Sequence, residues 1–172
     1  MNKTLKISAA ALLLALVVSA HSSMIKIETG NSTAGPQVDA AAYKAVVNAA
    51  VAIPTAGYGS AFPAIYDNIT NQGLFGSGND IAFKSTVDFG VSAANAGTWE
   101  IRSGVDFGLG GALFVDGVAQ DFKTSDMWWN GSYADSTQFL SITLNLAAGN
   151  HTLNLYGLEH CCDGPQQAQF RF

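Results

Sequence analysis

The stretch from Phe139 to Leu158, which reads FLSITLNLAAGNHTLNLYGL, decides the fold. Apolar and polar residues alternate on both sides of Gly149 and Asn150, and this pair of residues favours a turn. A period of two places the apolar side chains of an extended chain on one face, whereas a helix needs a period of about 3.6 residues. The stretch therefore predicts two β-strands, at 139–146 and 151–158, each with one buried face.

The same alternation recurs along much of the chain. Further strands are expected at residues 24–28, 82–91, 97–107, 112–116 and 167–172. Asp116 and Gly117 form a strong turn pair at the end of one of these strands. Short strands separated by glycine-rich turns are typical of two packed antiparallel sheets. The sequence therefore predicts a mainly β protein, an antiparallel β-sandwich or jelly roll.

One segment near the N-terminus has helical spacing instead. Between Val38 and Ala52 the larger apolar residues fall on one helical face, Asp39 can cap the start, and Pro54 forbids continuation. One short N-terminal helix is predicted there. Residues 55–80 are rich in Gly, Pro, Asn and Ser, so they are expected to form a loop. Four apolar residues are expected to pin this loop to the core: Phe62, Ile65, Tyr66 and Leu74.

The composition limits the class of protein. The chain has 172 residues, of which 48% are hydrophobic and 12% charged, which suits one folded domain and argues against intrinsic disorder. The formal net charge of −5 disfavours a nucleic-acid partner, because phosphate backbones are bound by basic faces.

The first twenty residues have the features of a secretory signal. Lys3 and Lys6 precede an apolar run from Ala9 to Val18, and small residues at the end of the segment fit a cleavage site after Ala20. The run is shorter than the roughly 20 residues that span a bilayer. We therefore expect a signal peptide at 1–20 and a single secreted domain at 21–172, without stable membrane insertion of the mature chain.

A glycine-rich segment, GVDFGLGG at 104–111, connects two predicted strands. No Lys-Ser or Lys-Thr and no helix follow it, so it is neither a phosphate loop nor a dinucleotide fingerprint. One interpretation is a ligand or cation loop built on Asp106, with Gly108 and Gly110 allowing close approach of the backbone. The other is a tight strand connection with a bulge, which is the simpler explanation of the glycines alone.

Two adjacent tryptophans, Trp128 and Trp129, lie in a polar, turn-prone stretch that begins at Asp126. In an extended chain they point to opposite sides, so one enters the core and the other faces solvent or a partner; the sequence does not choose between them. An exposed aromatic ring beside Asp and Asn side chains suits a sugar ring whose hydroxyls are hydrogen-bonded. The alternative is that both rings seal the edge of the sandwich.

Aspartates dominate the acidic residues of the C-terminal half of the chain. Carboxylates and loop carbonyls are the ligands that Ca²⁺ takes, so a calcium site is one interpretation, with Asp106 and Asp116 as candidate ligands. The spacing matches no EF-hand. The alternative is a solvated acidic surface.

The only two cysteines, Cys161 and Cys162, are adjacent. An oxidising compartment favours a disulfide, which would rigidify a surface loop. A bridge between neighbours needs a distorted or cis peptide bond, because Cα atoms across a trans peptide lie closer than in ordinary disulfides. This vicinal disulfide is the first interpretation. Intermolecular pairing is the second, and a metal site with His160 and Asp163 is the third.

No motif of a catalytic nucleophile or a metalloprotease is present, and Glu100 and Glu159 are isolated in the sequence. We therefore expect a protein without catalytic activity. A hydrolase that uses two carboxylates is the less favoured alternative, since such pairs form only in the fold.

Several segments follow one another in the C-terminal part of the chain: WEIR at 99–102, GVDFG at 104–108, GGALFVDG at 110–117, MWW at 127–129, AGNHTL at 148–153, YGLE at 156–159 and CCDG at 161–164. Together they resemble the CCXG family of bacterial secreted proteins, which often carry a PEP-CTERM sorting tail. The resemblance covers roughly residues 60–172, and the Cys-Cys-x-Gly motif in this frame is specific.

More distantly, the pattern is similar to the protective-antigen-type β-sandwich found in adhesins and glycosidases. In that family a pair of aspartates holds Ca²⁺, which in turn binds sugar hydroxyls. Asp106 matches the first aspartate of the pair, but Phe107 stands at the second position. The resemblance implies a β-sandwich and calcium-dependent sugar binding.

These observations lead to three hypotheses. The first is a secreted, non-catalytic carbohydrate-binding or adhesive module for an extracellular glycan or exopolysaccharide, with Asp106, Gly108, Gly110, Asp126, Trp128 and Trp129 as candidate binding residues. The second is a structural matrix or envelope protein that acts by self-association. The third is an extracellular polysaccharide hydrolase.

Overall fold

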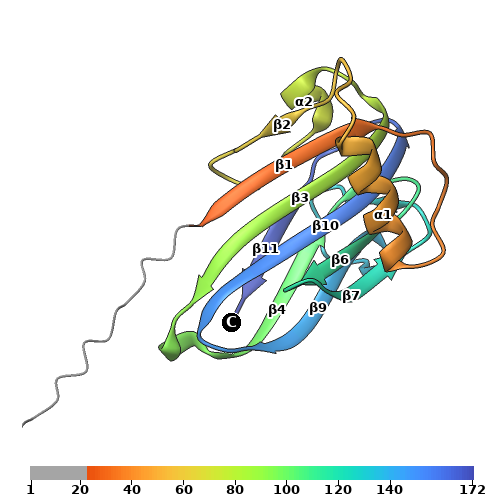
Figure 1. Ribbon diagram of the computed structural model, residues 1–172. Coiled ribbons are helices and arrows are strands. Elements are labelled where there is room, and N and C mark those ends of the chain that lie inside the picture. The colour runs from red at the N-terminus through yellow and green to blue at the C-terminus, as the bar shows by residue number, and fades with distance from the viewer. Residues whose placement is uncertain (1–22) are drawn as a thin grey trace, which may run out of the picture.

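The computed structural model describes residues 23–172, so the predicted signal peptide lies outside the described residues. Two antiparallel sheets face one another, and a helix covers the outer face of the larger sheet (Figure 1). The larger sheet has the order β2-β1-β3-β10-β6-β7. Its strands are β1 (Met24–Asn31), β2 (Ser60–Ala61), β3 (Asn79–Val91), β6 (Gly111–Val115), β7 (Val118–Lys123) and β10 (Gly149–Cys161). This arrangement confirms the predicted antiparallel β-sandwich.

The smaller sheet has the order β11-β4-β9, and a separate two-stranded ribbon joins β5 and β8. The strands are β4 (Gly97–Gly104), β5 (Asp106–Phe107), β8 (Met127–Trp128), β9 (Phe139–Leu146) and β11 (Gln167–Arg171). One strand had been expected over 97–107. It is broken at Val105, so that Gly104 ends β4 and Asp106 begins β5.

The two strands predicted from the 139–158 stretch both form, but in different sheets. β9 pairs with β4 in the smaller sheet, whereas β10 pairs with β3 and β6 in the larger one. The turn residues between them therefore carry the chain across the sandwich. β10 also begins earlier than predicted, at Gly149, where φ is +147°.

The main hydrophobic core fills the space between the sheets. Leu153 and Leu155 of β10 meet Ile101 of β4 and Leu140 of β9 there. The opposite face of the larger sheet carries a second cluster, in which Tyr156 and neighbouring side chains pack against α1. Because both faces of β10 are covered, residues 155–158 are buried on both sides of the strand.

The predicted helix is α1 (Ala40–Val51). Asp39 caps it as expected, since its carboxylate accepts a hydrogen bond of 2.8 Å from the backbone N–H of Ala42. Tyr43 and Val47 are fully buried against the sheet. Within residues 23–172, no helix has the length and apolar character needed to cross a membrane.

The stretch at 55–80 is less loop-like than predicted. It contains β2 and a short helix, α2 (Asn71–Phe75), which Thr70 caps and which ends at Gly76 with φ of +103°. Tyr66 is buried and Leu74 packs on the core, as expected. The expectation for Phe62 and Ile65 is wrong: they are 65% and 70% exposed, because the loop turns these two side chains outward.

The turn pair Asp116-Gly117 is confirmed. It joins β6 to β7 in a two-residue hairpin, with φ of +51° at Asp116 and +77° at Gly117. Positive φ at both central residues matches the right-handed twist of the strands. Two short 3₁₀ helices, η1 (Ala93–Asn95) and η2 (Ser136–Gln138), complete the described elements.

Candidate functional site

A polar hollow of about 320 Å³ lies where the β5–β8 ribbon meets the C-terminal end of β10. Its lining residues are Asp106, Gly108, Asp126, Trp128, Glu159, Cys161 and Cys162. Four of them were candidate binding residues from the sequence alone. None of the described lining residues is basic, so the hollow gathers carboxylates without a compensating side-chain charge.

Asp106 is one of the buried carboxylates of the hollow, with 8% of the residue exposed. Gly164 lies directly against it, and a Cβ at Gly164 would overlap the carboxylate. The backbone N–H of Gly164 donates a hydrogen bond to Asp106. Burial raises the pKa of Asp106 to about 7, and the negative charges of Glu159 and Asp126 add to the rise. Near neutral pH this side chain therefore exists in both protonated and ionised forms.

Glu159 also lines the hollow and is 4% exposed. Its carboxylate accepts a hydrogen bond from the backbone N–H of Gly108. The glycine-rich segment is held beside it by two further hydrogen bonds of 3.0 Å, from Leu109 N–H to the Leu158 carbonyl and from Leu158 N–H to the Gly110 carbonyl. Burial raises the pKa of Glu159 above its usual value, although the bonds from backbone N–H groups partly offset the rise.

The structure resolves the choice between the two tryptophans. Trp128 is 63% exposed and borders the hollow, whereas Trp129 is 5% exposed and packs over Gly104. The backbone N–H of Trp128 donates to Oε1 of Gln138 at 2.7 Å, which fixes the segment in place. Trp128 therefore offers an open aromatic face, and Trp129 is a core residue.

Cys161 and Cys162 form a vicinal disulfide, and the peptide bond between them is cis. This confirms the first interpretation of the pair. The metal-site and intermolecular interpretations are wrong, because both sulfurs are used in one bond within the chain. His160 also takes a separate partner, with its Nδ1 2.5 Å from Oδ1 of Asp80.

Three predicted site residues lie elsewhere. Trp129 is in the core, and Gly110 packs against the hydroxyl of Tyr43 with φ of +83°. Asp116 bonds to the backbone N–H of Thr152 at 2.9 Å, seven residues before Glu159 on β10. Seven residues of a strand span about 23 Å. Asp106 and Asp116 therefore cannot hold one ion together, and no three His, Cys, Asp or Glu side chains within residues 23–172 form a group suited to a metal.

Glu159 is the functional candidate that the sequence interpretation missed as a binding residue. It follows Leu153, Leu155 and Gly157 at intervals of two, on the face of β10 that enters the core. A lone carboxylate at a buried position of an alternating strand is a signal of a polar site. Glu100, the other isolated glutamate, lies on β4 and pairs with Arg171 at 3.0 Å.

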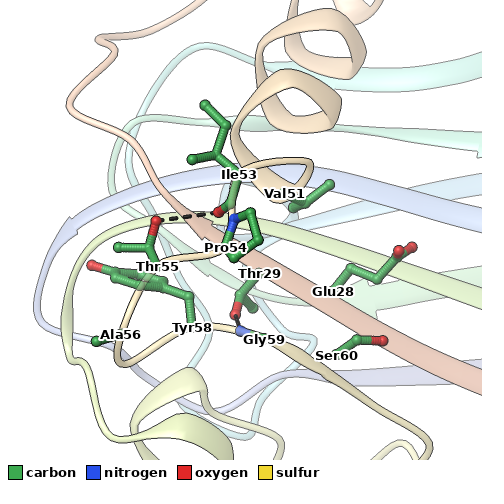
Figure 2. A pocket seen from close by; sticks show the side chains of 10 residues that line it. All are labelled: Glu28, Thr29, Val51, Ile53, Pro54, Thr55, Ala56, Tyr58, Gly59 and Ser60. Carbon is green, nitrogen blue, oxygen red and sulfur yellow. Dashed lines mark hydrogen bonds between the residues drawn. The ribbon is translucent and has the colours of Figure 1, made fainter.

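A second hollow, of about 440 Å³, lies between the end of α1 and the β1–β2 edge. Figure 2 shows Val51, Ile53 and Pro54 on one side of it and Glu28 on another. Both carboxylate oxygens of Glu28 are already in ion pairs, at 2.7 Å with Lys26 and 2.8 Å with Lys84. The acidic group of this hollow is therefore neutralised by the protein itself, unlike those beside Trp128.

Comparison with solved structures shows which known folds this chain resembles. The sugar-binding PA14 domain of an RTX adhesin matches with a TM-score of 0.54 and 12% sequence identity, over 88% of this chain and 90% of that domain. This chain is similar in fold to PA14 domains. The beta-glucosidase of Kluyveromyces marxianus matches with a TM-score of 0.51 and 10% identity over 86% of this chain, which spans only 17% of the enzyme. No protein-family model and no curated protein sequence matches.

Proposed function

We propose that this protein is a secreted, non-catalytic sugar-binding or adhesive module of the CCXG type, and that the hollow beside Trp128 is its binding site. One observation carries the proposal: a largely exposed tryptophan ring borders a hollow whose walls are carboxylates. Tryptophan is enriched at binding surfaces, because its ring offers a large apolar contact area and a polar N–H group. The likeness in fold to a sugar-binding domain of an adhesin supports the same conclusion.

The lining residues suit a sugar chemically. A pyranose ring has an apolar face of C–H groups that can stack on the indole of Trp128, and its hydroxyls are hydrogen-bond donors. Ionised carboxylates only accept hydrogen bonds, so Asp106, Asp126 and Glu159 can each bind a sugar hydroxyl. The partner that fits is therefore an extracellular glycan, including an exopolysaccharide.

A role of calcium is considered separately from the proposed sugar binding. Carboxylate oxygens are suitable ligands for the ion. However, the pairing of Asp106 with Asp116 does not fit, because these residues lie at opposite ends of β10. We therefore assign sugar binding to direct hydrogen bonds and stacking, and a dependence on calcium stays a prediction.

The test is a glycan array in which the purified protein is applied once with Ca²⁺ and once with a chelator. We expect binding to at least one glycan class, and Trp128→Ala should abolish it. Phe122→Ala is the matched control, because Phe122 is also an exposed aromatic residue, 44% exposed, but lies outside the hollow. Absence of binding in both conditions, or equal binding by Trp128→Ala, contradicts the proposal. Release of free sugar from bound glycans would contradict its non-catalytic part.

One observation favours self-association as a second candidate function. β7 is an edge strand of the larger sheet, and Val118 and Phe122 on it are 61% and 44% exposed. Open strand edges with apolar side chains can pair with another copy of the chain. Sedimentation velocity over a wide concentration range tests this candidate. Oligomers that Phe122→Asp dissolves support it, and a monomer at every concentration contradicts it.

A further inference from the structure

The hollow beside Trp128 has a neighbour. This neighbouring hollow, of about 540 Å³, is lined by residues of α2, of the segment that follows it and of the Cys162–Asp163 segment. Gln72, Ser77 and Asn79 supply amide and hydroxyl groups to its wall. Cys162 lines both hollows, so the disulfide forms the boundary between them. Both of its cysteines are exposed.

The two hollows are held in a fixed relation to each other. The Asp163 carboxylate accepts a hydrogen bond of 2.5 Å from the backbone N–H of Gln72, at the start of α2. The backbone N–H of Asp163 donates to the carbonyl of Gly78 at 3.2 Å. These bonds fasten the segment that carries the disulfide to α2 and to the residues that precede β3. The boundary between the hollows is therefore part of the packed structure.

The two hollows are lined by different chemical groups, as expected of two neighbouring subsites that bind successive units of one polymer. The first offers an aromatic face and carboxylates, whereas the second offers neutral amide and hydroxyl groups, with Asp163 tied to the backbone. Each hollow is in the size range of small-molecule sites, about 300–1,000 Å³. The exposed disulfide between them is weakly polar and presents sulfur, not a charged side chain, to anything that crosses it.

We propose that the two hollows are adjacent subsites of one surface, and that the ligand is a glycan segment of two or more sugar units that crosses the Cys161–Cys162 disulfide. This inference rests on the proposed sugar-binding function. It assigns Gln72 and Asn79 to the second subsite, where their side-chain amides bind sugar hydroxyls. Trp128 belongs to the first subsite and contacts every ligand, whatever its length.

Isothermal titration calorimetry with the monomer, dimer and tetramer of glucose, N-acetylglucosamine, galactose and mannose tests the inference. For the sugar that binds, we expect the tetramer to bind about tenfold more tightly than the monomer, the gain of one further set of hydrogen bonds. The double variant Gln72→Ala/Asn79→Ala should remove that gain and leave the affinity for the monomer unchanged within about twofold. Trp128→Ala should weaken binding of monomer and tetramer alike.

The outcomes separate this inference from the function on which it rests. If no sugar of any length binds, the proposed function itself fails. If the monomer binds as tightly as the tetramer, or if Gln72→Ala/Asn79→Ala leaves the tetramer affinity intact, the second subsite is refuted while sugar binding stands. Circular dichroism of the double variant checks its fold, and Gln72→Glu, which keeps the side-chain length, provides a second variant for the same comparison.

Discussion

The indole ring of Trp129 lies directly on the backbone of Gly104, so that a Cβ atom at position 104 would overlap the ring. This contact anchors the β5–β8 ribbon to the end of β4. Trp129 is further held by a hydrogen bond of 3.0 Å from its backbone N–H to the carbonyl of Val105. The buried ring of Trp129 thus fixes the position of the preceding residue, Trp128, whose exposed ring borders the hollow.

The substitution Gly104→Ala tests this contact. We expect it to lower the free energy of unfolding by about 2 kcal/mol, because overpacking a filled site typically costs about 1–3 kcal/mol. Urea unfolding measures the change. Gly35→Ala is the control, since a Cβ at Gly35 would meet no atom within 4 Å. Equal stability of the two variants would show that Trp129 does not occupy this position.

The Asp106 carboxyl group should lower the free energy of unfolding of the protein as the pH rises. Its pKa in the folded protein, about 7, lies above the ordinary value of 3.8, so the folded state binds the proton more tightly than the unfolded state. The protonated form is therefore the stable one in the fold, and stability falls as the pH rises from about 4 to about 7. Asp106→Asn removes this cost, and we expect a gain of about 2 kcal/mol at pH 8 that vanishes near pH 4.

Unfolding by urea at several pH values measures the gain from Asp106→Asn. Asp67→Asn serves as the control, because Asp67 is exposed and lies outside the hollow. A variant Asp106→Asn that is less stable than the wild type at pH 8 would contradict the assignment of a buried, poorly compensated carboxylate.

His151 should stabilise the folded protein in its protonated form, and therefore at lower pH. Its Nδ1 lies 2.7 Å from the Asp116 carboxylate and its Nε2 lies 2.9 Å from the Ala147 carbonyl. Burial alone would lower the pKa of His151, but these hydrogen bonds outweigh it and raise the pKa above 6.5. Burial likewise opposes the shift at Asp116, whose pKa is lowered below 3.8 by the bonds from His151 and Thr152.

Both shifts favour the charged pair in the fold. The contribution of His151 is complete below its unfolded pKa and is lost as the pH rises through the folded value, whereas that of Asp116 is lost at low pH. We expect His151→Ala to cost about 1 kcal/mol more at pH 5.5 than at pH 9, since Asp116 is partly exposed. The His151 ring also packs against the ring of Phe89, with 5.6 Å between the centroids. A cost that stays constant across this pH range would mean that the charge of His151 contributes nothing beyond this packing.

Alternation predicted most of the strands, because large apolar residues recur at intervals of two along much of β3, β9 and β10. It failed where the structure departs from a two-faced strand. β7 was missed since it is a short edge strand whose outward residues include Val118 and Phe122. α2 was missed because its five residues include Gly73 and are stabilised by capping from Thr70, a local hydrogen bond with little periodic signal.

The candidate site was predictable only in part. Asp106, Asp126 and Trp128 belong to neighbouring polar segments, so their grouping followed from the sequence. Glu159 reaches the same hollow from β10, and its partner Gly108 is 51 residues away in the chain. That contact depends on how β10 lies beside the glycine-rich segment, which local patterns do not encode.

The central claim, that sugar binds at Trp128, can be tested most directly by NMR of protein labelled with ¹⁵N in the indole groups. The chain has three tryptophans, Trp99, Trp128 and Trp129, so three indole signals are expected. Titration with the glycan selected by the array should move the signal of Trp128 and leave that of Trp99 in place, because Trp99 lies on β4, away from the hollow. A saturable shift at Trp99 with none at Trp128 would contradict the account.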